Sequence, residues 1–116
     1  MEKLIFDVLS KDTLVSHVEI IDDKINIKRY VLHPAIQPFG NNDMNVNFEW
    51  INAFLESRCF DKNRPDKDEI LEYLGLDSYN TLNIVKKTHG RILGDFTWIR
   101  FPNETLTWKD LAYEGI

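Results

Sequence analysis

Residues 52–76 read NAFLESRCFDKNRPDKDEILEYLGL, and this stretch decides how the second half of the chain folds. Two helical patterns flank a short polar connection that carries Arg58 and Arg64. On a helix over residues 46–58, the apolar side chains cover an arc of roughly 200° at 100° per residue. Arg58 falls inside that arc. Because an unpaired buried charge costs several kcal/mol, we expect Arg58 either to reach solvent or to meet acceptors in the fold.

The same stretch predicts the limits of a second helix. Pro65 suits the first helical position, and Asp66 with Glu69 predicts a capping box. Gly75 is expected to end this helix as a C-terminal cap.

The rest of the second half predicts three further elements. A third helix is expected to begin at residue 77 or 78 and to be closed by Gly90. Residues 95–101 are rich in aromatic and β-branched side chains and are expected to form a strand. Thr107 and Asp110 predict another capping box, which opens a last short helical turn.

The first half reads as a three-stranded antiparallel meander over residues 3–32. Apolar and polar residues alternate there, and turns are expected at residues 11–12 and 22–24. Residues 33–45 hold prolines, a glycine and an Asn-Asn-Asp cluster, which predicts a loop from sheet to helices. The whole chain, residues 1–116, is therefore expected to be one α+β domain.

Composition limits the class of protein. The chain has 116 residues, 43% of them hydrophobic, and 14 aromatic side chains (three Trp, four Tyr and seven Phe), which is enough for a real core. No apolar run approaches the ~20 residues needed to cross a bilayer, and the N-terminus does not resemble a signal peptide. A single cysteine suits a reducing cytoplasm, and a net charge of -5 argues against general nucleic-acid binding.

Residues with catalytic or metal-binding chemistry are scattered. His17, His33 and His89 show no metal-ligand spacing, and no glycine-rich phosphate loop is present. Cys59 follows Arg58, which would lower its pKa, but no base is arranged beside it, so we expect a small buried apolar side chain. The sequence therefore predicts no catalytic residues, no metal and no cofactor.

A basic cluster is formed by Lys86, Lys87 and Arg91 at the end of the third predicted helix. Cations at a helix C-terminus complement the helix dipole, and this structural role is the preferred interpretation. The other interpretation is that the cluster contacts DNA.

The tryptophans are expected to divide between the core and the surface. Trp50 and Trp98 are assigned to the core, because large aromatic side chains anchor cores and interfaces. Trp108 is expected to be partly exposed.

An ordered set of positions resembles the N-terminal region that precedes the catalytic domain of bacterial HipA-like kinases. The positions are Arg58, Arg64, Leu74-Gly75, Asp95, Trp98-Ile99, Leu106 and Trp108. Asp61 stands where that family usually has proline, which implies a looser connection. The chain ends where the kinase domain begins in that family, so the resemblance implies an accessory module without kinase activity.

The resemblance also supplies a partner for the buried arginine. Arg58 and Arg64 are expected to bond carbonyls or carboxylates that tie the helix connection to the closing segment. Asp95 is the preferred acidic partner, because it begins the strand that the family pattern retains.

The leading functional hypothesis is a non-catalytic protein-interaction module. It would bind and restrain a partner such as a HipA-like kinase, as part of a toxin–antitoxin pair or of a mobile element. Phe60, Lys62, Asn63 and the end from Trp108 to residue 116 are the expected contact residues. The alternative for Phe60 is packing against the second helix.

The alternative functional hypothesis is a phage-type inhibitor that occupies a nucleic-acid-binding surface with acidic side chains. It would need one surface formed by five residues: Asp61, Asp66, Asp68, Glu69 and Glu72.

Overall fold

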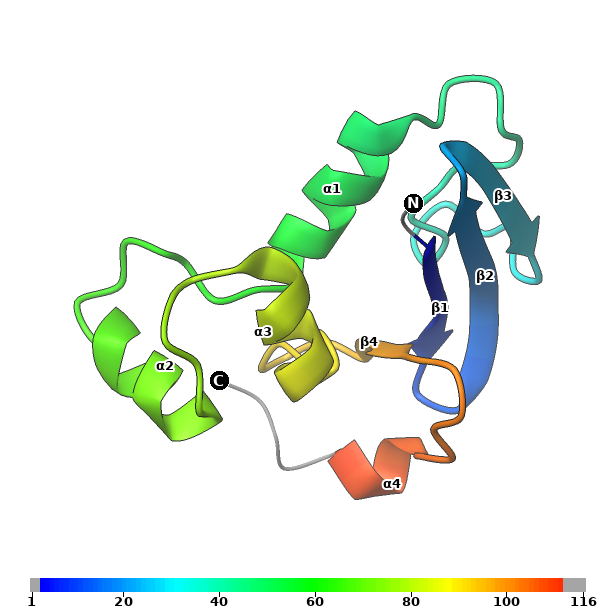
Figure 1. The fold of residues 1–116 in the computed structure, drawn as a ribbon. Coiled ribbons are helices and arrows are strands. Elements are labelled where there is room, and N and C mark those ends of the chain that lie inside the picture. Colours follow the sequence, from blue (N-terminus) through cyan, green and yellow to red (C-terminus); the bar gives the residue numbers. More distant parts are fainter. Residues whose placement is uncertain (1–2, 112–116) are drawn as a thin grey trace.

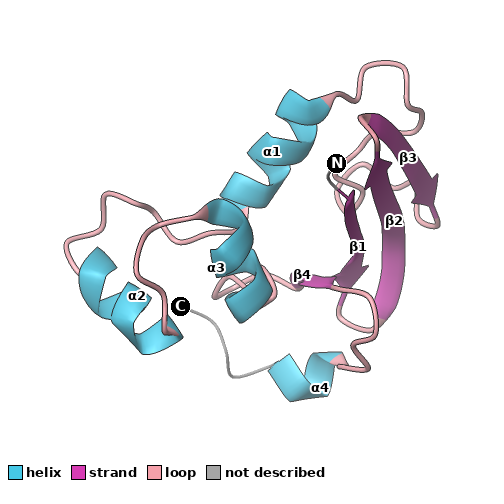
Figure 2. Cartoon of the chain, viewed as in Figure 1, coloured by secondary structure: helices cyan, strands magenta, loops and turns pink. Residues whose placement is uncertain are grey.

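The computed structural model describes residues 3–111, which form a sheet with helices packed on it (Figure 1). The sheet has four antiparallel strands in the order β3-β2-β1-β4 among these residues. The elements are β1 (Lys3–Ser10), β2 (Thr13–Ile21), β3 (Lys24–Arg29), α1 (Phe48–Ser57), α2 (Lys67–Leu74), α3 (Thr81–Thr88), β4 (Thr97–Arg100) and α4 (Trp108–Leu111). This order confirms the expected α+β fold (Figure 2).

The meander forms where the sequence predicts it. Its turns place Lys11, Asp22 and Asp23 at positive φ. In β2, Ser16 faces Val8 and Leu14 faces Leu9, so Val15 is an extra, bulged residue. The third strand ends at Arg29 and not at residue 32. The reason is that the next two backbone N–H groups both donate to the Val15 carbonyl, which bends the chain.

The fourth strand lies on the free side of β1 and is shorter than expected. It covers residues 97–100, while the prediction was residues 95–101. Pro102 has no N–H to give to a sheet, and Asp95 N donates to Ile92 O in a turn before the strand. Residues of the C-terminal part of the chain hydrogen-bond to the turn between β1 and β2. Trp98 Nε1 donates to Lys11 O at 2.6 Å, and Trp108 N donates to Asp12 Oδ1 at 2.8 Å.

The first two helices differ from their predicted starts. α1 begins after Asn47, whose side chain accepts from Trp50 N. α2 begins after Asp66, whose side chain makes no cap hydrogen bond, so the predicted capping box with Glu69 is wrong. The Asp66 carboxylate instead accepts from Arg64. Gly75 takes the expected left-handed cap with φ 76°.

The third helix begins later than predicted. It starts after Asn80, which accepts from Asn83 N, and not at residue 77 or 78. Its left-handed cap residue is His89, with φ 57°, and Gly90 follows at φ 66°. At α4, Asp110 Oδ2 accepts from Thr107 N, which is the expected contact that opens this last turn.

Three apolar clusters hold these elements together. The largest lies between one face of the sheet and the helices α1 and α3, with members such as Phe6, Val18, Ile51, Leu55, Val85 and Ile99. A second cluster joins α2 to α3 at a distance from the sheet and includes Phe60, Ile70, Leu71 and Ile84. Consecutive strand residues face opposite sides, so Leu9 lies on the other face from Val8. There it packs with Trp98 and Leu111 beneath α4.

The tryptophans follow this layout. Trp98 is fully buried, as expected. Trp50 packs at the edge of the main cluster, and its Nε1 donates to Pro38 O at 2.9 Å. Trp108 is half-buried, which agrees with the expectation of partial exposure.

Candidate functional site

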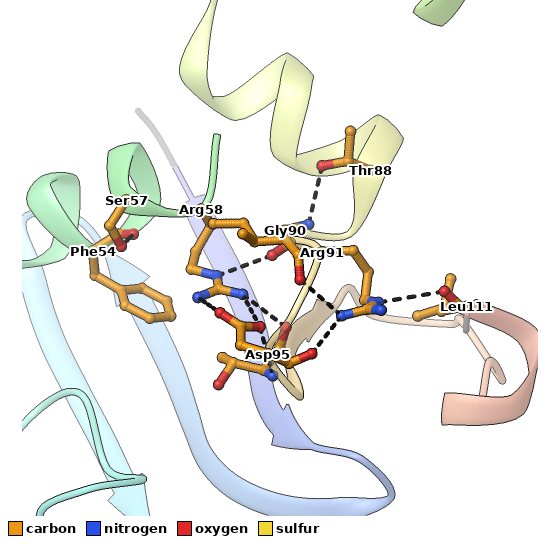
Figure 3. A network of polar contacts seen from close by, with 10 residues as sticks. Phe54, Ser57, Arg58, Thr88, Gly90, Arg91, Asp95 and Leu111 are labelled. Carbon is orange, nitrogen blue, oxygen red and sulfur yellow. Dashed lines mark hydrogen bonds and ion pairs between the residues drawn. The ribbon is translucent and has the colours of Figure 1, made fainter. Parts of the chain in front are cut away.

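Arg58 is the C-terminal cap of α1 and is almost wholly buried. Its Nη1 and Nη2 donate to the two carboxylate oxygens of Asp95 at 3.0 and 2.9 Å. Its Nε donates to Gly90 O, and Nη2 also donates to Thr97 O, each at 2.9 Å (Figure 3). The structure thus brings together Arg58 and Asp95, and the guanidinium fastens α1 to the segment between α3 and β4.

Arg91 lies beside this pair and is also buried. Its Nη1 donates to Asp95 O at 2.9 Å and its Nε to Leu111 O at 3.3 Å. The guanidinium lies 4.3 Å from the ring centroid of Trp108. The basic cluster predicted at the end of α3 is therefore divided. Lys86 and Lys87 are exposed, while Arg91 is buried among backbone carbonyls.

Arg64 does not reach the closing segment, which corrects the expectation. Its Nε and Nη2 donate to the carboxylate of Asp66 at 2.9 and 2.8 Å. Both side chains are more than one-third exposed. A carboxylate two residues away satisfies the guanidinium locally, so no distant acceptor is needed. Exposed pairs of this kind contribute little to stability.

A small cavity of about 220 Å³ opens between these arginines, with Arg58, Arg64 and Arg91 in its wall. Cys59 also lines it. Burial, and secondarily the Glu56 carboxylate, raises the pKa of the Cys59 thiol to about 11. The lowering by Arg58 that the sequence suggested does not occur, because the guanidinium is directed toward Asp95. A thiol with this pKa is almost fully protonated near neutral pH and is a poor nucleophile.

Phe60 is buried and not presented to a partner. It packs edge-to-face on Tyr79 with ring centroids 5.3 Å apart, and the Tyr79 hydroxyl donates to Phe60 O. Phe60 packs against Ile70 and Leu71 of α2, which is the alternative interpretation of this residue. An aromatic side chain in a polar turn could serve either role, and the sequence alone did not choose between them.

The other expected contact residues are dispersed. Lys62 and Asn63 are exposed, as a contact surface would require. Trp108 is held between Arg91 and Phe96, whose ring centroid is 5.9 Å away. Residues 112–116 lie outside the described part of the chain.

Two of the five acidic residues that the alternative hypothesis requires form local hydrogen bonds. Asp66 binds Arg64, and Asp61 Oδ1 accepts from Asn63 N at 2.8 Å. Asp68 and Glu72 lie on α2, where they line a shallow groove with Gly75. Of the five residues, Asp66 is paired with a cation, whereas the other four are exposed and form no ion pair in the described structure.

The histidines have individual polar partners. His17 contacts Asp7 and Glu19 on the outer face of the sheet, and His89 Nε2 lies 2.9 Å from Glu104 Oε2. His33 Nδ1 accepts from the backbone two residues further on. Within residues 3–111, no three His, Cys, Asp or Glu side chains are placed to hold a metal ion. None of the helices in that range is long and apolar enough to span a membrane.

Large apolar side chains are exposed at nine described positions, whose distribution the sequence analysis did not predict. They are Ile21, Tyr30, Leu32, Ile36, Met44, Phe48, Tyr73, Leu93 and Phe96. Five of these nine fall within residues 30–48, the segment that joins β3 to the start of α1.

The segment of residues 30–48 is held in place from the sheet. Arg29 donates to the carbonyls of Phe39, Gly40 and Asn42, and it pairs with Asp43 at 2.6 Å. Arg29 therefore anchors the middle of this segment, residues 39–43, to the end of β3.

No protein-family model, no curated protein and no solved structure matches this chain. The resemblance to HipA-like kinases thus remains a prediction from the residues quoted above. The class that fold and site define is an α+β domain with a buried arginine–carboxylate centre.

Proposed function

We propose that this chain is a non-catalytic protein-interaction module. The observation that carries the proposal is that five of the nine exposed large apolar side chains among the described residues fall within one segment, residues 30–48. Single exposed apolar residues are ordinary on protein surfaces, whereas a concentration of them is typical of interaction sites. Leu32 is 60% exposed and Met44 is 85% exposed, so neither serves the core of the folded chain.

The anchoring of residues 30–48 by Arg29 supports the same proposal. Association requires that side chains and loops become ordered, which opposes binding. Here four acceptors on the segment already bind one guanidinium, whose side chain is only 8% exposed. A segment that is already ordered loses less conformational entropy when a partner docks.

The reactive side chains give catalysis little support. Arg58 and Asp95 form an ion pair with two hydrogen bonds, and the thiol of Cys59 has a raised pKa. The partner that fits the resemblance is a HipA-like kinase, which the module would bind and restrain in the cytoplasm. The module would then belong to a toxin–antitoxin pair or to a mobile element.

The test is affinity capture from the native host, combined with direct titration of a purified HipA-like kinase from that host. The disabling variant carries Leu32→Glu and Met44→Glu. The matched control is Tyr73→Glu, because Tyr73 is as exposed as Met44 but lies on α2.

We expect the wild type and the Tyr73→Glu control to retain the same protein partner, and the double variant to lose it with an unchanged melting temperature. Capture of nucleic acid without protein, or turnover of a substrate, would contradict the proposal. Capture of a different protein, with no binding of the kinase, would support the interaction module but contradict the kinase as its partner.

A further inference from the structure

The edge of β1 is only partly covered by β4. β4 pairs with Asp7–Ser10, whereas β1 begins at Lys3. The register sets Asp7 opposite Arg100, so its continuation would set Ile5 opposite Pro102. Pro102 has no N–H and cannot continue the ladder.

The chain turns away at this point. Phe101 N is occupied by the Glu104 carboxylate, and Glu104 N donates to Phe101 O. Asn103 takes a positive φ of 71° in the same turn. β1 therefore continues for several residues past the end of its neighbour (Figure 1).

The backbone groups of this overhang point toward the uncovered edge. Ile99 N donates to His89 O on the side of β4 away from β1. The backbone N–H and C=O groups of the residues on either side of Ile99 therefore point toward β1. Lys11 N likewise donates across to Phe96 O. Backbone directions alternate along a strand, and the bulge lies in β2, so Ile5 and Lys3 face the same side as Lys11. Among the described residues, no backbone hydrogen bond is formed on that side of Lys3 or Ile5.

A groove of about 460 Å³ lies along this overhang. Ile5, Phe101 and Pro102 give it an apolar wall. Lys3 and Lys86 also line it, and neither forms an ion pair in the described structure. Among the described residues of the wall, the one carboxylate is that of Glu104, whose oxygens contact His89 and Phe101 N. The groove is thus locally cationic on a chain whose net charge is -5.

We propose that this groove docks an extended acidic segment of a partner protein. The segment adds to β1 as a new strand beyond the end of β4, and it directs a carboxylate toward Lys3 and Lys86. Strand addition uses the unpaired backbone groups for affinity, and the side-chain pockets select the sequence. The two lysines select acidic side chains by charge complementarity. This inference rests on the proposed function and assigns it a second contact site, away from residues 30–48.

The test uses the full chain and a short synthetic peptide in which Val and Glu alternate. Fluorescence anisotropy gives its dissociation constant, and amide chemical shifts locate its contact. The disabling variant is Lys3→Glu with Lys86→Glu. The control is Lys24→Glu with Lys28→Glu, which makes the same charge change on β3 at the opposite edge of the sheet.

We expect the disabling variant to weaken peptide binding by about tenfold, and the control variant to leave it nearly unchanged. A peptide that is N-methylated on alternate residues cannot donate to the edge and should bind as weakly as a peptide with Lys in place of Glu. The amide shifts should change at residues 3–6.

Three results would overturn the groove as a peptide site. These are no saturable peptide binding, equal binding by the N-methylated peptide, or tighter binding of a single-stranded oligonucleotide at the same amides. If the host partner is lost on changing residues 32 and 44 but kept in the Lys3/Lys86 variant, the groove proposal fails and the interaction module stands.

Discussion

Arg58 joins groups that lie 32 to 39 residues further along the chain. Its side chain is 10% exposed, while that of Asp95 is 42% exposed. A bidentate partner and two carbonyls therefore compensate the burial of the guanidinium, and the carboxylate keeps part of its hydration. A single residue thus fixes the end of one helix against the start of a distant strand.

Replacing Arg58 with Ala should lower the free energy of unfolding by about 2–4 kcal/mol, because packing is lost and two buried carbonyls lose their donor. Urea unfolding of the purified variant measures this. Arg64→Ala is the matched control and should change stability by less than about 0.5 kcal/mol, since its pair with Asp66 is exposed. Equal stability of the two variants would show that Arg58 is not structural.

Cys59 should react slowly with iodoacetamide in the folded protein. Its pKa of about 11 is raised from 9.0, so the thiolate population near neutral pH is about 100-fold below that of an ordinary thiol. The alkylation rate should rise about tenfold per pH unit up to that pKa. Because the unfolded chain loses this proton first, stability should also fall as the pH rises above about 9. Rapid alkylation of the native protein at neutral pH would contradict the raised pKa of this partly buried thiol.

Among the elements, the strands of the meander were predictable and the helix starts were not. No other strong turn signal lies near turn residues such as Lys11-Asp12, so the apolar–polar alternation and the turn residues predict the same strand ends. Before α3, however, Asp77, Ser78 and Asn80 can all cap a helix, and local preference does not choose between them. Packing of Tyr79 against Phe60 accompanies the later start, and that contact joins residues 19 apart.

The two buried arginines also differ in how far the sequence could predict their burial. Arg58 could be located because helical periodicity directs it inward. Arg91 could not, because in sequence it belongs to the same basic cluster as the exposed Lys86 and Lys87. Its environment is formed by Trp108 and Leu111, which only tertiary structure brings to it.

Gly90 is required for both its conformation and its size. A Cβ atom there would lie 3.1 Å from Ile99 Cδ1 and 3.2 Å from Arg58 Cβ. Gly75 also has positive φ, but a Cβ there meets nothing within 4 Å. Gly75→Ala should therefore cost about 1–2 kcal/mol from backbone strain, and Gly90→Ala about 1–3 kcal/mol more from overpacking. Thermal unfolding of the pair measures the difference, and equal losses would refute the crowding argument.

At the scale of the whole molecule, the three apolar clusters share elements. β1 contributes to the main cluster and to the cluster beneath α4, and Cys59 packs against both the main cluster and the one around Phe60. We therefore expect one cooperative transition in urea, with the same midpoint by far-ultraviolet circular dichroism and by tryptophan fluorescence. Two separated midpoints would instead indicate that the α2 region unfolds on its own.

The bond from Trp98 Nε1 to Lys11 O spans 87 residues. A ribosome that adds about 5–20 residues per second takes roughly 4–17 s to make that length of chain. Once β3 is complete at Arg29, the nascent meander has neither its fourth strand nor the indole that covers Leu9 until residues 97–100 are made. An apolar strand edge is thus presented to every neighbouring nascent chain, and the lysines of β3 protect only the opposite edge. Yield in cells should consequently depend on how fast residues 30–100 are translated.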